Sequence, residues 1–219
     1  MYDEKHRFFT VSSNPGKKDL THQKGAREHL LCKDCEERFA RYEKYFSEAF
    51  FDGVSVDFRD DGQDLYIEGI DYQRTKLLFL SVLWRMSVSS LSFFRSVALG
   101  PHEERIRVML LADDPGTQEQ YGVTAVVPYS KREHLGHFVL PPDDVRVGAN
   151  RVYRIVIGGI LYLFHVPGKL LPQSVISRLL SPEGKWVFTR KQVEDLGFLF
   201  HDLMKIGEGI NRREGWPSE

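Results

Sequence analysis

Two cysteines separated by two residues are the side chains in this sequence with the clearest chemical potential. In Cys32-Lys33-Asp34-Cys35, two sulfur atoms lie close enough along the chain to bind one metal ion. A structural zinc site requires four ligands in a tetrahedron, and the chain has only these two cysteines. The spacing therefore predicts a structural zinc site at Cys32 and Cys35. We expect the remaining ligands to come from another chain or from histidines, with these candidates: His6, His22 and His29.

The same pair of cysteines allows two other interpretations, and both stay open at this point. A cysteine at the start of a helix has a lowered pKa, as in redox-active dithiols, although those motifs belong to a βαβ pattern that this sequence lacks. The simplest interpretation is two reduced, half-buried cysteines without a chemical role, since free cysteine is among the most often buried residue types.

The segment after the cysteines has the pattern of an amphipathic helix over residues 36–51. Apolar and aromatic residues recur at spacings of three and four, which indicates one buried stripe. Arg38, Arg41 and Lys44 recur at a spacing of three, and the helix face that they share is predicted to bind the phosphates of DNA. A solvated charged helix explains these residues equally well. Glu36 and Glu43 have positions suited to metal ligands, but they are better explained as ordinary solvated helix charges.

A family resemblance becomes visible once these motifs are taken together. Residues 25–36 (GAREHLLCKDCE), followed by Phe39, Tyr42 and Glu43, resemble the second half of the zinc ribbon in bacterial HNH-endonuclease-like proteins. Residues 2–9 (YDEKHRFF) resemble the segment that precedes the cysteines in that family. The similarity extends to two later segments, residues 83–87 (LWRMS) and residues 99–104 (LGPHEE).

The resemblance implies a protein that binds DNA and, when complete, cleaves it with a catalytic divalent cation. In that family a first cysteine pair and a Ser-His-Ile-Ile-Pro-like segment, whose histidine is the general base, come before this region. The chain as written contains neither, so we expect it to bind DNA without cutting it. The alternative function is a non-catalytic module that binds a protein partner and keeps the cysteine pair only as a vestige.

Composition excludes several other classes of protein. Lys plus Arg is 30 and Asp plus Glu is 31, so the chain is not a globally basic nucleic-acid binder. The charged start of the chain is not a secretory signal, and the apolar runs at residues 77–94 and 155–166 are too short or too interrupted to cross a membrane. Two cysteines are too few for a secreted disulfide scaffold, which favours the cytoplasm. No Gly-rich nucleotide motif is present, so no nucleotide cofactor is expected.

The order of helical and strand-like segments predicts an α+β fold. A small HNH-like unit of cysteine pair plus helix is expected over residues 1–53. A larger body with helices and an antiparallel sheet is expected over residues 54–219. Within this body we expect helices over residues 71–112, strands over residues 122–166 with a hairpin turn at Gly158-Gly159, and a C-terminal helix over residues 189–210. His165, inside an apolar strand, is expected to be a core histidine with its hydrogen bonds satisfied.

Overall fold

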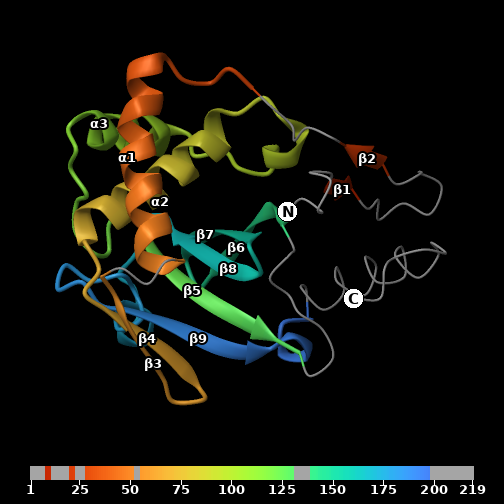
Figure 1. Cartoon of the computed structure of the whole chain (residues 1–219). Coiled ribbons are helices and arrows are strands. Elements are labelled where there is room, and N and C mark those ends of the chain that lie inside the picture. Colours follow the sequence, from red (N-terminus) through yellow and green to blue (C-terminus); the bar gives the residue numbers. More distant parts are fainter. Residues whose placement is uncertain (1–7, 11–19, 23–27, 52–54, 131–138, 198–219) are drawn as a thin grey trace.

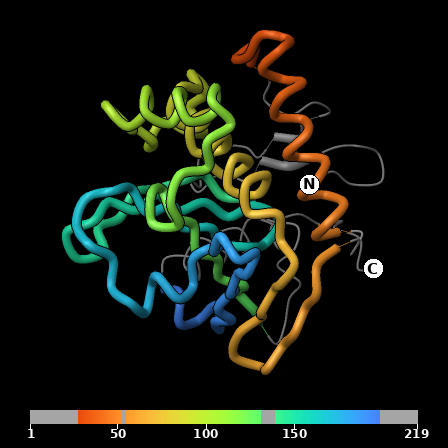
Figure 2. Tube along the Cα trace, turned by 90° about the vertical axis from the view of Figure 1, so that its left-hand side faces the viewer, coloured from red at the N-terminus to blue at the C-terminus, as the bar shows by residue number. Residues whose placement is uncertain are grey.

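The computed structural model describes residues 8–10, 20–22, 28–51, 55–130 and 139–197, the first two ranges as backbone only. A seven-stranded sheet forms one layer, and three helices lie over one of its faces (Figures 1 and 2). The expected α+β fold is confirmed. Within the residues described, no helix combines the length and apolar character needed to cross a membrane.

The described residues form four α-helices and nine strands. The helices are α1 (Lys33–Phe50), α2 (Tyr72–Val88), α3 (Pro101–Leu111) and α4 (Gln173–Ile176). The strands of the large sheet are β3 (Asp57–Asp60), β4 (Asp64–Glu68), β5 (Gly122–Tyr129), β6 (Leu140–Val147), β7 (Asn150–Ile157), β8 (Ile160–His165) and β9 (Trp186–Gln192). Two further strands, β1 (Phe8–Thr10) and β2 (Leu20–His22), pair only with each other.

The sheet is antiparallel except at one pair of strands. Its order is β3-β4-β9-β5-β8-β7-β6, and β5 runs parallel to β9. The predicted turn at Gly158-Gly159 joins β7 to β8, with Ile157 opposite Ile160. The expected antiparallel sheet thus contains one parallel pair, which β9 forms with β5. Strand β8 is antiparallel to β5, so it finishes beside the first residues of β5. The connection over residues 166–185 leaves the chain at this same end of the strands, and β9 therefore runs in the direction of β5.

Helix α2 ends at Val88, where serine side chains bind outside the helical backbone pattern. The carboxylate of Glu28 accepts hydrogen bonds from the Ser89 hydroxyl (2.7 Å) and from the backbone N–H (2.9 Å) and hydroxyl of Ser90. Serines that find such partners compete with the helical backbone pattern. The chain then forms a short 3-10 helix, Ser92–Phe94, before α3.

The predicted C-terminal helix over residues 189–210 is wrong at its start. Residues 186–192 form β9, which pairs with β4 on one side and β5 on the other, and Val193–Asp195 is a single 3-10 turn. Thr189 and Gln192 have the spacing of a helix capping box, which favoured a helix here, but the Thr189 hydroxyl accepts a hydrogen bond from the Arg178 guanidinium at 2.6 Å. The part of the prediction over residues 198–210 lies outside the described residues.

The main core lies between the helices and the sheet and is built on aromatic side chains. Trp186 of β9 is fully buried, and its ring centroid lies 5.2 Å from Phe79 of α2 and 4.7 Å from Phe188. Phe39 and Tyr42 of α1 belong to the same cluster of buried residues. The core is thus continuous across the predicted boundary at residue 53, and the division into two domains stays a prediction.

Trp186→Ala should lower the free energy of unfolding by about 3–5 kcal/mol, because it removes the largest buried ring from a closely packed cluster. The measurement is urea unfolding followed by circular dichroism. Leu170→Ala is the control, since that leucine is 92% exposed and should change stability little. Equal stability losses in the two variants would contradict this description of the core.

Burial also perturbs a lysine in α2. Lys76 is 1% exposed, and desolvation lowers its pKa to about 7. In the unfolded chain the lysine pKa is near its ordinary value, so below pH 7 protonation of this amine lowers the free energy of unfolding. This loss of stability becomes smaller as the pH rises from 7 towards the ordinary lysine pKa. Wild type should therefore gain stability between pH 6 and pH 9 relative to Lys76→Met, as measured by urea unfolding at both pH values. Identical pH dependence in the two proteins would show that the lysine is not buried as a charge-sensitive group.

Candidate metal centre

The two cysteines lie together at the start of α1. Cys32 is the residue that caps the helix N-terminus, with extended backbone angles, and the backbone N–H of Glu36 bonds to its carbonyl at 3.0 Å. Asp34 and Glu36 are acids in the first turn, where the helix dipole favours negative charge. Cys32 is exposed and Cys35 is half-buried. The helix start therefore presents the Cys32 thiol on the outside of the molecule, with the half-buried Cys35 thiol beside it.

The two thiols have different electrostatic surroundings. The sulfur of Cys32 makes no capping hydrogen bond, but the nearby backbone N–H and thiol of Cys35 favour its thiolate and lower the pKa of Cys32. The pKa of Cys35 is raised, chiefly because its own thiol proton is held by Cys32, with burial as the next cause. The pair thus holds one thiolate most easily at Cys32. A metal ion, which binds thiolates, would compete with the second proton.

The segment before the cysteines is fixed to the body of the protein. Leu31 packs against the main core, and Glu28 is bonded to Ser89 and Ser90 at the end of α2. The serine hydroxyls and the Ser90 amide lower the pKa of Glu28. The positioning role of Glu28 was not predicted. The signal in the sequence was the serines that interrupt the apolar stretch over residues 77–94.

The other predicted zinc ligands are not assembled around the cysteines in the described residues. His29 is exposed on the segment before Cys32. His6 lies outside the described residues, and of His22 only the backbone in β2 is described. In the part of the chain that is described, no group of three or more His, Cys, Asp or Glu side chains is placed to hold a metal ion. The described structure therefore contributes two ligands, Cys32 and Cys35, to the candidate site.

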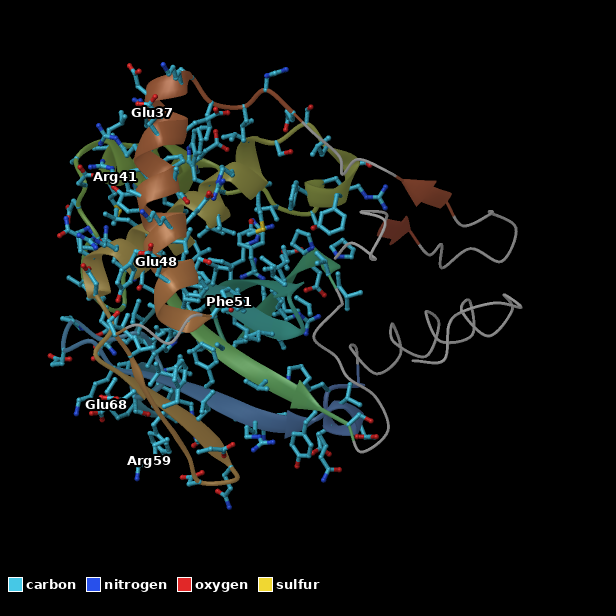
Figure 3. The ribbon with its side chains drawn as sticks, viewed as in Figure 1. Glu37, Arg41, Glu48, Phe51, Arg59 and Glu68 are labelled. Atoms are coloured by element: carbon cyan, nitrogen blue, oxygen red, sulfur yellow. The ribbon has the colours of Figure 1, made fainter. Side chains whose placement is uncertain are left out.

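The three basic residues predicted to bind DNA do not form one free face. The Arg38 guanidinium lies 3.2 Å from the Leu110 carbonyl and 2.7 Å from the Leu111 carbonyl, so it caps the C-terminus of α3. Arg41, labelled beside α1 in Figure 3, is exposed. The Lys44 ammonium lies 3.7 Å from a carboxylate oxygen of Glu48. The outward face of α1 mixes both signs of charge.

The two acids considered as metal ligands on α1 have separate environments. Glu36 is exposed in the first turn of the helix, one residue after Cys35. Glu43 lies two turns further on, and its carboxylate forms an ion pair with Arg85 of α2 at 2.9 Å. That guanidinium also lies over the Phe39 ring. Glu43 therefore helps to join α1 to α2. Of these two acids, Glu36 is the one close in sequence to the thiols.

Comparison with known proteins adds no relative: no family model, no curated protein and no solved structure matches this chain.

The asymmetry between the thiols gives a direct prediction. In the reduced protein treated with a chelator, a short pulse of iodoacetamide at pH 7 should modify Cys32 faster than Cys35, because Cys32 is more exposed and its thiolate is favoured. Peptide mass spectrometry measures the two rates. In urea the two cysteines should react at similar rates, which is the control. Equal rates in the folded protein, or a faster Cys35, would contradict the arrangement at the helix start.

Proposed function

We propose that this protein is a zinc-binding, HNH-like protein that binds DNA, with Cys32 and Cys35 as two of the zinc ligands. One observation carries the proposal: two thiols converge at the exposed N-terminus of α1, and that helix is built into the main core. A helix N-terminus favours thiolates, which are the form that binds zinc. Among the described residues, the exposed Cys32 thiol is open to a metal ion from solvent.

A closed structural site requires two more ligands than the described residues supply. We assign these ligands to His6 and His22, or to a second chain, with His29 as the histidine nearest in sequence. Zinc held in this way would join the segment before residue 28 to the start of α1. A reducing compartment such as the cytoplasm, which the sequence predicts, would keep both thiols available for the metal.

DNA binding is the less direct part of the proposal. The exposed cations near the cysteines are Lys33, Arg41 and Lys44, and acids on the same helix reduce their combined field. Since phosphate contacts depend on salt, we expect weak binding that disappears as salt is raised. A catalytic divalent cation enters only if the residues of a complete HNH site are supplied, so the proposal for this chain is binding rather than cleavage.

Metal analysis of the purified full chain tests the zinc proposal. After reconstitution with zinc and removal of free metal, we expect about one zinc per chain, set by the ligand arithmetic of a single tetrahedral site. Cys32→Ser and Cys35→Ser should each lose most of the zinc. Lys33→Ser is the matched control, because it changes the same exposed loop without removing a thiol, and it should keep the metal. A wild-type protein that holds no zinc, or serine variants that hold as much as wild type, would overturn the proposal.

The unequal pKa shifts favour a second candidate function, a redox-active dithiol. An exposed cysteine with a favoured thiolate, followed by a second thiol with a raised pKa, is the arrangement of an attacking and a resolving cysteine. A zinc-free protein that forms a reversible Cys32–Cys35 disulfide with oxidised glutathione would support this candidate. A zinc-free protein with unreactive thiols would instead favour the protein-interaction module.

A further inference from the structure

The inner strands of the large sheet are closed to a further strand. Each has a neighbour on both sides, and within the described residues β3 and β6 form the two edges. His165 of β8 is typical of this interior: it is 5% exposed, its Nε2 lies 3.0 Å from the Thr124 hydroxyl, and its buried Nδ1 has no hydrogen-bond partner. The expectation of a satisfied core histidine is therefore right about burial and wrong about its hydrogen bonds. A chain that extends this sheet has to pair with an edge strand.

The edge strand β6 is protected against such pairing. Its second and third residues, Pro141 and Pro142, have no backbone N–H to offer a further strand. The Ser96 hydroxyl bonds to the Pro142 carbonyl, and the pairing of β6 with β7 shifts register between Leu140 and Asp143, as at a β-bulge. Proline and a bulge are common means by which proteins protect the edge of a sheet.

The other edge strand, β3, has neither a proline nor a bulge. It pairs with β4 in regular register, and all four of its residues, Asp57–Asp60, are exposed at the border of the sheet (Figure 1). The Asp61 N–H bonds to the Asp64 carbonyl at 3.2 Å, and in an antiparallel pair such bonds recur at every second residue. Arg59 therefore bonds to β4, whereas the N–H and carbonyl of Phe58 are directed away from the sheet.

Exposed aromatic rings lie beside this free edge, on the helix side of the sheet. Phe58 is opposite Ile67 of the main core, and its ring lies 6.3 Å from Phe50 of α1, yet it is 47% exposed. Phe51, labelled at the end of α1 in Figure 3, is 80% exposed. The border of the core is thus left uncovered at β3.

The opposite face of β3 carries one acid and one base. The Arg59 guanidinium lies 4.3 Å from the centre of the Tyr66 ring, and Asp57 shares this face because side chains alternate along a strand. Within the described residues neither Asp57 nor Arg59 forms an ion pair. The order of the strand, acid, aromatic, base, is complementary to itself when it is read in the antiparallel direction.

We propose that two copies of this chain form a homodimer through β3, with the strands antiparallel about a two-fold axis at Phe58. The two Phe58 residues exchange backbone hydrogen bonds, and their rings meet on the helix side. On the other face Asp57 of each copy lies directly opposite Arg59 of the other, and such cross-strand pairs of opposite charge stabilise a sheet.

Charge and backbone pairing select this register over its neighbours. A two-fold axis at Asp57 or at Arg59 places like charges directly opposite each other, which destabilises the pair. A shift of one residue places Phe58 opposite Arg59, whose backbone groups are already bonded to β4. Charged residues commonly keep edge strands apart, but their order in β3 permits one register.

The short strand sets the strength of the dimer. With four residues in β3 the interface is below the standard size, so we expect a dissociation constant on the order of 100 µM. The proposal is independent of the metal centre, because Cys32 and Cys35 lie at the start of α1 and Phe51 follows its end.

Sedimentation velocity of the full chain from about 5 to about 500 µM tests the proposal. Chelator and reductant are present throughout, so that neither a shared metal ion nor a disulfide joins two chains. The wild type should be mostly monomer at the lowest concentration and mostly dimer at the highest. A wild type that stays monomeric at the highest concentration would overturn the proposal.

Charge reversal tests whether β3 is the interface. Asp57→Arg and Arg59→Asp each place like charges opposite each other, so each should weaken dimerisation at least about tenfold. An equimolar mixture of the two variants should dimerise with nearly wild-type strength, because every introduced charge then meets its opposite, and a folding defect would not be rescued in this way.

Glu119→Arg and Lys169→Asp are the matched controls, since both residues are exposed on loops at the ends of β5 and β8. These controls should dimerise like the wild type. The proposal fails if the β3 variants dimerise as strongly as the controls, or if mixing the two β3 variants restores no dimer.

Discussion

The aromatic packing that fixes α1 to the rest of the molecule is the interaction on which the other features depend. Phe46 and Phe50 stack on each other with ring centroids 4.2 Å apart. They meet Phe79 of α2 at 5.6 Å and Trp186 of β9 at 6.3 Å, respectively. Because these contacts hold the C-terminal half of α1 in the core, the N-terminal half extends beyond the sheet (Figure 1). Both cysteines lie at that extended end.

The N-terminal half of α1 is held by polar contacts in addition to the buried rings of Phe39 and Tyr42. Arg38 caps the C-terminus of α3, and the Tyr42 hydroxyl bonds to Asp113 just after that helix. Desolvation and this carboxylate raise the pKa of Tyr42 to about 12. The helix is therefore rigidly oriented along its length, and the position of Cys32 and Cys35 follows from contacts made well below them. A metal site at this point would use a helix end that is already in place.

The sequence predicted features with a strong local period and missed those decided by distant contacts. The aromatic stripe of α1 was predicted from spacing, and Phe39, Tyr42 and Ala49 are indeed buried. The strand β9 was missed because Thr189 and Gln192 imitate a helix cap, whereas pairing on both sides with β4 and β5 decides the outcome. Arg38 could not be separated from Arg41 by spacing, since only the fold shows that the end of α3 lies beside it. The cysteine pair was found directly, because three-residue spacing and a following helix are local properties.

The central proposal is that Cys32 and Cys35 bind one metal ion through both sulfurs. Titration of the reduced full chain with cobalt(II) tests this claim most directly, since sulfur-to-cobalt charge-transfer absorption reports bound thiolates and the visible bands report geometry. The expected result is a tetrahedral cobalt spectrum whose charge-transfer intensity corresponds to two thiolates. Each single serine variant should lose most of the bound cobalt, and with it most of that absorption. A spectrum without charge-transfer absorption, or one unchanged by removal of either cysteine, would contradict it.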